Sequence, residues 1–146
     1  MVLVDTNILL YAINGDSPHH NEAKAAVESL ANGRQPWVLT WGVIYEFLRV
    51  ATHPRVFPKP LALTAAHRFI ASLLASESCF VLAETQDHQQ ILIDCLKDAP
   101  RLAGNMIHDL HYAVLMREHA VKEVLTLDTD FRAFPWVRIS NLTNSE

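Results

Sequence analysis

The sequence is short of glycine and cysteine, and each shortage excludes a class of protein. Its 146 residues include only four glycines, at positions 15, 33, 42 and 104. They are too scattered to form a glycine-rich loop that cradles a phosphate. The two cysteines, Cys79 and Cys95, have no CxxC spacing. We therefore expect both to be reduced packing residues rather than a disulfide or a metal centre.

Long apolar runs and a surplus of positive charge are also missing. No apolar stretch approaches the ~20 residues that span a bilayer, and no basic segment followed by a cleavable apolar stretch indicates a secretion signal. We expect a cytoplasmic protein with no membrane partner. The formal net charge is −4, so the chain as a whole lacks the positive charge that is typical of proteins that bind nucleic acid. A nuclease stays compatible with this charge, because bound metal would offset part of a clustered acidic charge.

The apolar share of the chain is high for a small protein. Half of the residues are hydrophobic and only 19% are charged, so we expect a partner to cover some apolar surface, either a second copy or another chain. The length fits one domain with one core, over residues 1–146.

Short apolar runs alternate with amphipathic stretches. The runs predict strands at residues 2–4, 37–39, 78–82, 123–127 and 136–139, and the amphipathic stretches predict helices at 7–13, 19–30, 41–52, 63–75, 85–96 and 105–119. This alternation is typical of an α/β protein with a mostly parallel sheet. The first and fourth strands are each followed by an acid. If these strands are neighbours, both carboxylates emerge at the sheet edge where open α/β folds place their sites.

Four acids stand in apolar surroundings and suggest a pocket for a hard divalent cation: Asp5, Glu46, Asp109 and Asp128. Asp5 has a plain alternative role as the N-cap of the helix that follows it. Because Thr6 and Asn7 can also cap a helix, that role does not require Asp5, and we favour the metal interpretation.

The other three acids have structural explanations as well. Glu46 could pair with Arg49 on a helix surface, Asp109 could be favoured by the dipole of its helix, and Asp128 could form an Asx-turn. Asn105 shares a helix face with Asp109, and small and apolar residues continue that face. The side chain of Asp109 could therefore face a pocket rather than solvent.

Neighbouring residues narrow the choice of site. Asp130 lies farther from its strand than Asp128, and we rank it lower as a ligand. His108 and His111 are three residues apart and could bind zinc. No further His/Cys set supports a closed zinc site, so we interpret them as polar surface or substrate-side groups. An EF-hand is excluded because no glutamate occupies position 139. A haloacid-dehalogenase-type phosphatase would have a second aspartate at position 7. This sequence has Asn7 there, so we exclude that class.

The segments 4–12 and 104–109, Glu46 on its helix, and the segment 126–131 together resemble a PIN domain, and most of all the VapC toxins of type II toxin–antitoxin systems. The resemblance spans the whole chain. It implies an α/β/α sandwich around a mostly parallel sheet of four to five strands. It also implies a Mg²⁺- or Mn²⁺-dependent endoribonuclease. The acids match the family's quartet in order, with Asp5 and Asp109 as the principal metal ligands, and the polar residues that support such a site would be Thr6, Asn7, Asn105 and Asp130.

The resemblance also implies partners and a reaction. VapC toxins are usually homodimers, and each is held inactive by a VapB antitoxin. RNA would be cut by in-line attack of water, leaving a 5′-phosphate and a 3′-hydroxyl. Candidates for contacts with RNA phosphates are Arg49, Arg55, Lys59, Arg101 and Arg132. Two alternatives stay open: a non-catalytic PIN-like dimer that binds RNA or a protein, and a metal-dependent nuclease or phosphatase with a substrate other than RNA.

Overall fold

The computed structural model describes residues 1–142. Its strands are β1 (Val2–Val4), β2 (Trp37–Thr40), β3 (Cys79–Leu82), β4 (Glu123–Leu125) and β5 (Arg138–Ser140). Its helices are α1 (Thr6–Ile13), α2 (His20–Asn32), α3 (Trp41–Ala51), α4 (Leu63–Leu74), α5 (His88–Asp98), α6 (Met106–Glu118) and a short 3₁₀ helix, η1 (Thr129–Ala133). Residues 143–146 lie outside the described part, so the predicted domain limit at residue 146 stays a prediction.

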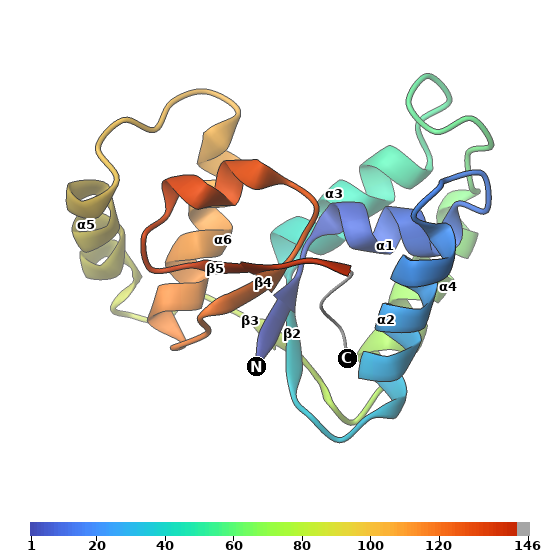
Figure 1. Ribbon diagram of the computed structural model, residues 1–146, viewed down its shortest axis with the longest axis horizontal. Coiled ribbons are helices and arrows are strands. Elements are labelled where there is room, and N and C mark those ends of the chain that lie inside the picture. Colours follow the sequence, from blue (N-terminus) through green and yellow to red (C-terminus); the bar gives the residue numbers. More distant parts are fainter. Residues whose placement is uncertain (143–146) are drawn as a thin grey trace.

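The five strands form one sheet in the order β3-β2-β1-β4-β5, and every pair is parallel. Parallel neighbours require crossover connections, which put helices on the faces of the sheet. In Figure 1, α1 to α4 lie on one side of the strands and α5 and α6 on the other. The predicted α/β/α sandwich with a parallel sheet is confirmed.

The core lies at the centre of the sheet and under helix α3. Leu3 and Val4 of β1 are fully buried because β2 and β4 flank this strand and helices cover its faces. In α3, the buried residues recur every three or four positions, at Val43, Ile44, Phe47 and Ala51. This spacing places them on one face of the helix. The opposite face of α3 carries Glu46 and Arg49 together with the exposed aromatic side chains of Trp41 and Tyr45.

Several predicted boundaries differ from the structure by one to three residues, and two of the larger differences have a local reason. Helix α5 begins at His88 rather than at residue 85, because the amide and hydroxyl of Thr85 donate to the Glu118 carboxylate at 2.7 and 2.6 Å. Strand β4 ends at Leu125, before the predicted residue 127. Strand β5 begins at Arg138, beyond Trp136, whose indole Nε1 donates to the carbonyl of Ala113. Helix η1 follows β4 and was not predicted.

Within residues 1–142, no helix combines the length and the apolar character needed to cross a membrane.

Candidate active site

The carboxyl ends of β1 and β4 meet at one edge of the sheet and place two polar segments side by side. Val4 pairs with Leu125 in the sheet, and the amide of Asp5 donates to the carbonyl of Leu125 at 3.0 Å. Asp5 and Thr126 are therefore the first residues beyond two adjacent strands. The prediction that the first and fourth strands are neighbours is confirmed.

Asp5 is buried and serves as the N-cap of α1. Its Oδ1 accepts from the amide of Thr6 at 2.8 Å, and its Oδ2 accepts from the hydroxyl of Thr126 at 2.7 Å. Our expectation that the cap does not require Asp5 is wrong. Burial raises the pKa of Asp5 to about 6, opposed by the hydrogen bonds from Thr126 and Thr6 and reinforced by the charges of Glu46 and Asp128. Asp5 therefore caps the helix and is at the same time a carboxylate whose ionised form is disfavoured by burial.

Glu46 turns from α3 toward Asp5. Its Oε2 accepts from the Thr6 hydroxyl and from the Tyr112 hydroxyl, each at 3.1 Å. None of the ion pairs found within residues 1–142 joins Glu46 to Arg49. The structural alternative for Glu46, a surface pair with Arg49, is therefore wrong. Glu46 is instead linked by Thr6 to the end of β1 and by Tyr112 to α6.

Asp109, Asp128 and Asp130 form the tightest acidic group. Each offers a carboxylate oxygen, and these oxygens all lie within 4.8 Å of one another. The pKa of Asp109 is raised to about 7, first by burial and then by the charges of Asp5, Asp128, Glu46 and Asp130. All four predicted quartet members and Asp130 thus act on one another electrostatically.

Asp128 also shapes the backbone beside the site. Its Oδ1 accepts from the amide of Asp130 at 2.8 Å and caps η1. The Asx-turn interpretation is therefore correct as local structure, and it coexists with the acidic group. The turn brings Asp130, ranked lower from the sequence, to the same spot as Asp128.

Two polar residues, the buried Thr126 and the half-buried Asn7, support these acids. The Thr126 hydroxyl donates to Asp5 and accepts from the Asn7 Nδ2 at 3.2 Å and from the Asp128 amide at 2.9 Å. Asn7 Oδ1 is buried without a hydrogen-bond donor among the residues of the described chain. Asn105, in contrast, lies exposed at the start of α6, and its side chain does not cap the helix.

Sequence reasoning missed two side chains that shape the site, Thr126 and Tyr112. Thr126 is a hydroxyl directly before the Leu127–Asp128 turn, and its position at a strand end beside Asp5 is the signal that could have identified it. Tyr112 lies three residues after Asp109 on α6, a spacing that places both on neighbouring parts of one helix surface. Its contact with Glu46 depends on how α3 and α6 pack.

The donor set fits a hard divalent cation. The side chains that converge offer carboxylate oxygens, which Mg²⁺ and Mn²⁺ prefer. The pKa values of Asp5 and Asp109 are raised, first by burial and then by neighbouring carboxylates, and a bound cation would favour the ionised forms of both. Asn7 Oδ1 adds an unpaired acceptor beside the same network. The residues that could hold the ion are Asp5, Glu46, Asp109, Asp128 and Asp130.

Two of the predicted cationic residues border the site. Arg49 lines a hollow of about 300 Å³ together with Glu46, and Arg132 lines another of about 460 Å³ together with Asp128. Lys59 pairs with Asp16 at 4.0 Å, on the loop after α3. Arg101 lines a separate hollow after α5. Arg49 and Arg132 therefore each share a hollow with an acid of the site.

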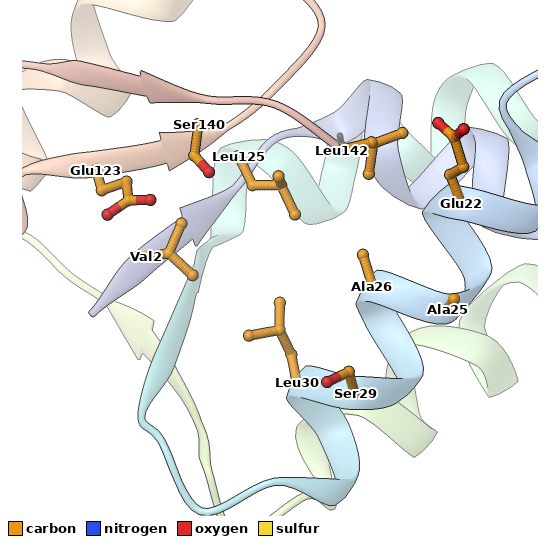
Figure 2. A pocket seen from close by; sticks show the side chains of 10 residues that line it. All are labelled: Val2, Glu22, Ala25, Ala26, Ser29, Leu30, Glu123, Leu125, Ser140 and Leu142. Carbon is orange, nitrogen blue, oxygen red and sulfur yellow. The ribbon is translucent and has the colours of Figure 1, made fainter. Parts of the chain in front are cut away.

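A further hollow lies away from the acids. It measures about 560 Å³ and is bounded by α2 on one side and by β1 and β4 on the other. Figure 2 shows Ala26 and Leu30 of α2 facing Val2 and Leu125 across it. It contains Glu22 and Glu123 but none of the clustered acids, so its size does not mark it as the site of chemistry.

Comparison with known proteins gives consistent likenesses over nearly the whole chain. The sequence model of the PIN domain matches residues 2–137. Ribonuclease VapC37 of Mycobacterium tuberculosis is 34% identical over 138 residues, which cover 94% of each chain. Ribonuclease VapC48 of the same species is 31% identical over 135 residues, which cover 92% of each chain.

Solved structures show the same fold. The crystal structure of VapBC2 from Rickettsia felis, bound to a promoter DNA fragment, contains a chain that matches with a TM-score of 0.65 at 18% identity, covering 97% of this chain and 98% of that one. Mycobacterium tuberculosis VapC20, described as a sarcin-ricin loop cleaving toxin, matches with a TM-score of 0.63 at 21% identity, covering 94% of this chain and 99% of that one.

Proposed function

The chain belongs to the PIN-domain family, and we propose that it is a Mg²⁺- or Mn²⁺-dependent endoribonuclease, the toxin of a VapBC-type toxin–antitoxin pair that acts in the cytoplasm. The observation that carries this proposal is the acidic group at the ends of β1 and β4: Asp109 and Asp128 lie within 4.8 Å of each other by their carboxylate oxygens, and burial, followed by the charges of Asp5, Asp128 and Glu46, raises the pKa of Asp109 to about 7. Curated relatives at 31–34% identity bear the name Ribonuclease VapC.

Each residue of the site has a proposed task. Asp5, Asp109, Asp128 and Glu46 would hold the ion. The carboxylate oxygens of Asp109 and Asp128 lie within 4.8 Å of each other and of Asp130, while Asp5 and Glu46 act on Asp109 through their charge. Thr126 holds Asp5 by its hydroxyl, and Thr6 and Tyr112 hold Glu46. Bound Mg²⁺ or Mn²⁺ would lower the pKa of an attacking water and polarise the scissile phosphate. These carboxylates come from separate elements of the fold, which leaves open positions for phosphate and water between them.

The proposed RNA path follows the cations that border the acids. Arg49 lies beside Glu46 and Arg132 beside Asp128, each in its own hollow. Guanidinium groups on the two flanks of an acidic centre can bind the phosphates on either side of the scissile one. The remaining predicted cations, Arg55, Lys59 and Arg101, would act farther along the strand.

The proposed partners are a VapB-like antitoxin and a second copy of the chain. The structures that share this fold include VapBC complexes from Rickettsia felis and Salmonella typhimurium. Exposed aromatic side chains on α3, Trp41 at 52% and Tyr45 at 69%, offer apolar area that a partner could cover.

Purified protein tests this proposal on three substrates in parallel: structured RNA, DNA of the same sequence and a phosphate monoester. We expect RNA cleavage that requires Mg²⁺ or Mn²⁺, stops with EDTA, and is lost in Asp5→Asn together with growth inhibition. Cleavage of DNA or the monoester in preference to RNA would favour the alternative substrate classes. Retained partner binding with no cleavage of any substrate would favour the non-catalytic module.

A further inference from the structure

A second cluster of metal-ligand side chains lies outside the acidic site, between the segment before α5 and helix α6. Glu84, His88 and His111 each offer one ligand atom, and these atoms lie within 4.8 Å of one another. His111 Nε2 lies 2.7 Å from Glu84 Oε1. The rings of His88 and His111 meet edge to face, with centroids 5.8 Å apart. His108, the histidine paired with His111 from sequence spacing, is exposed and is not a member of the cluster.

A buried carboxylate stands behind the cluster. The Glu118 side chain is only 2% exposed, and its Oε2 lies 2.6 Å from His88 Nδ1. The other oxygen of Glu118 accepts two hydrogen bonds from Thr85. With Nδ1 engaged by Glu118, Nε2 is the nitrogen that His88 has available for a cation. A carboxylate that fixes the tautomer of a metal-binding histidine is the usual outer partner of such ligands.

We propose that Glu84, His88 and His111 bind a single Zn²⁺ ion, with Glu118 as a positioning residue behind His88. Two imidazoles and one carboxylate form a ligand set that suits Zn²⁺ and leaves its fourth position to water. Imidazole nitrogen favours Zn²⁺ over Mg²⁺, so this cluster and the acidic site would select different ions.

Admitting the ion requires the ligand atoms to rearrange, because they now lie within 4.8 Å of one another and not at one common spacing. Zinc ligands at about 2.0–2.1 Å in a tetrahedron lie roughly 3.3 Å apart. The His111–Glu84 pair, now at 2.7 Å, would therefore open by roughly 0.6 Å. Both side chains are near half exposed, at 45% and 51%, so they can turn without disturbing the core. His88, at 24%, is held by Glu118 and would supply the fixed ligand.

Titration calorimetry with Zn²⁺, in excess Mg²⁺ to occupy the acidic site, tests this inference on the full chain. We expect one bound Zn²⁺ per chain. The affinity should fall by at least about tenfold in His88→Ala and in His111→Ala, and by about 10–100-fold in Glu118→Gln, the scale for an outer-shell partner. His108→Ala is the matched control, because it removes a histidine from the same helix, and it should bind as the unchanged protein does.

A second measurement keeps the test independent of folding defects and of RNA cleavage. Co²⁺ in place of Zn²⁺ should give the visible absorption of a four-coordinate site in the unchanged protein and in Asp109→Asn, and none in the two histidine variants. Circular dichroism checks that each variant is folded. Unchanged Zn²⁺ affinity in folded His88→Ala and His111→Ala, or Zn²⁺ binding that disappears in Asp109→Asn, would overturn the inference. The result is separate from the proposed ribonuclease activity, which neither readout measures.

Discussion

The acidic site and the cluster of Glu84, His88 and His111 both include a residue of α6. They differ in whether neighbouring groups compensate the charge of the carboxylates. In the acidic site, burial and then the charges of neighbouring acids raise the pKa of Asp109 to about 7. In the cluster of Glu84, His88 and His111, the pKa of Glu84 is lowered, first by its own backbone amide and then by the hydrogen bond with His111. The comparison teaches that acidic side chains alone do not indicate a cation site; buried carboxylates without a compensating partner are the stronger sign.

The largest expected effect comes from removing one uncompensated charge. In Asp109→Asn, we expect the rate of Mg²⁺-dependent RNA cleavage to fall by at least about a hundredfold, the scale for losing one preorganised electrostatic group. The metal-free variant should also unfold at a higher temperature, because repulsion among the acids is relieved. Cleavage assays and thermal unfolding in EDTA measure both.

Asp16→Asn is the control for this variant. Asp16 is exposed and pairs only at 4.0 Å with Lys59, so the same chemical change there should leave cleavage as it was. If Asp109→Asn still cleaves RNA at near the original rate, the acidic site described above is not the catalytic one.

The second prediction concerns how stability depends on pH. The pKa is raised for Asp5 and Asp109 in the acidic site and lowered for Glu84 in the other cluster. The folded-state pKa values of Asp5 and Asp109, about 6 and about 7, lie above their ordinary values of 3.8. The folded metal-free protein therefore binds protons that the unfolded chain has released, and this contribution to stability is lost as pH rises from about 4 to about 7. We expect the unfolding temperature in EDTA to fall across that interval.

A divalent metal ion should restore the lost stability only at pH values at which the acids are ionised. Added Mg²⁺ should raise the unfolding temperature at pH 7 and have little effect near pH 4, because it replaces the protons that compensate the site. A flat profile in EDTA, or an equal effect of Mg²⁺ at both pH values, would contradict the raised pKa values. Asp109→Asn should reduce the pH dependence.

A smaller effect should follow from removing the hydroxyl that supports Asp5. Thr126→Val keeps the shape of the side chain but leaves Asp5 Oδ2, Asn7 Nδ2 and the Asp128 amide without their shared partner. Unpaired buried polar groups cost about 1–3 kcal/mol, and we expect denaturant unfolding to show a loss of this size. Cleavage should fall by about 10–100-fold, as for other residues that orient metal ligands.

Thr126→Ser is the matched variant, since it retains the hydroxyl. It should recover most of the cleavage rate that Thr126→Val loses. An equal loss in both variants would assign the effect to the missing methyl group and to packing, not to the hydrogen bonds.

The smallest effect is expected at Tyr112, which joins the two groups. Its hydroxyl donates to Glu46, and its ring lies nearly parallel to that of His111 at 6.3 Å. Tyr112→Phe should cost about 0.5–1.5 kcal/mol of stability for the lost hydrogen bond and lower cleavage severalfold. Zn²⁺ titration of the same variant should match the unchanged protein, because no ligand atom of the cluster is removed.

Much of the fold and of the acidic site is readable from the sequence because its signals are local. Buried runs such as 2–4 and 37–39 are short and apolar, and acids at their ends stand out. Thr40, directly before the predicted helix at 41–52, is of a residue type that caps helices, and its hydroxyl does accept from the Val43 amide at 3.1 Å. The cap formed by Asp5 was judged unnecessary because two other residues could serve, and sequence alone does not rank such competitors.

The rest depends on contacts between distant segments. His88 and His111 are 23 positions apart and meet only because α5 packs on α6, so the helical spacing of His108 and His111 was misleading. The start of α5 was misplaced because the side chain of Glu118, far along the chain, binds Thr85. Tyr112 gained its link to Glu46 in the same way, through the packing of α3 near α6.

The place of β1 in the sheet has a consequence for synthesis on the ribosome. This strand is made early, yet it lies between β2 and β4, and Val2 pairs with Glu123. A nascent chain cannot complete its central pairing, or bring Asp128 to Asp5, until more than a hundred further residues have been translated. Contacts of such long sequence separation form late and slowly. A growing polypeptide would therefore lack an assembled acidic site for RNA cleavage until β4 and the turn that follows it have been translated.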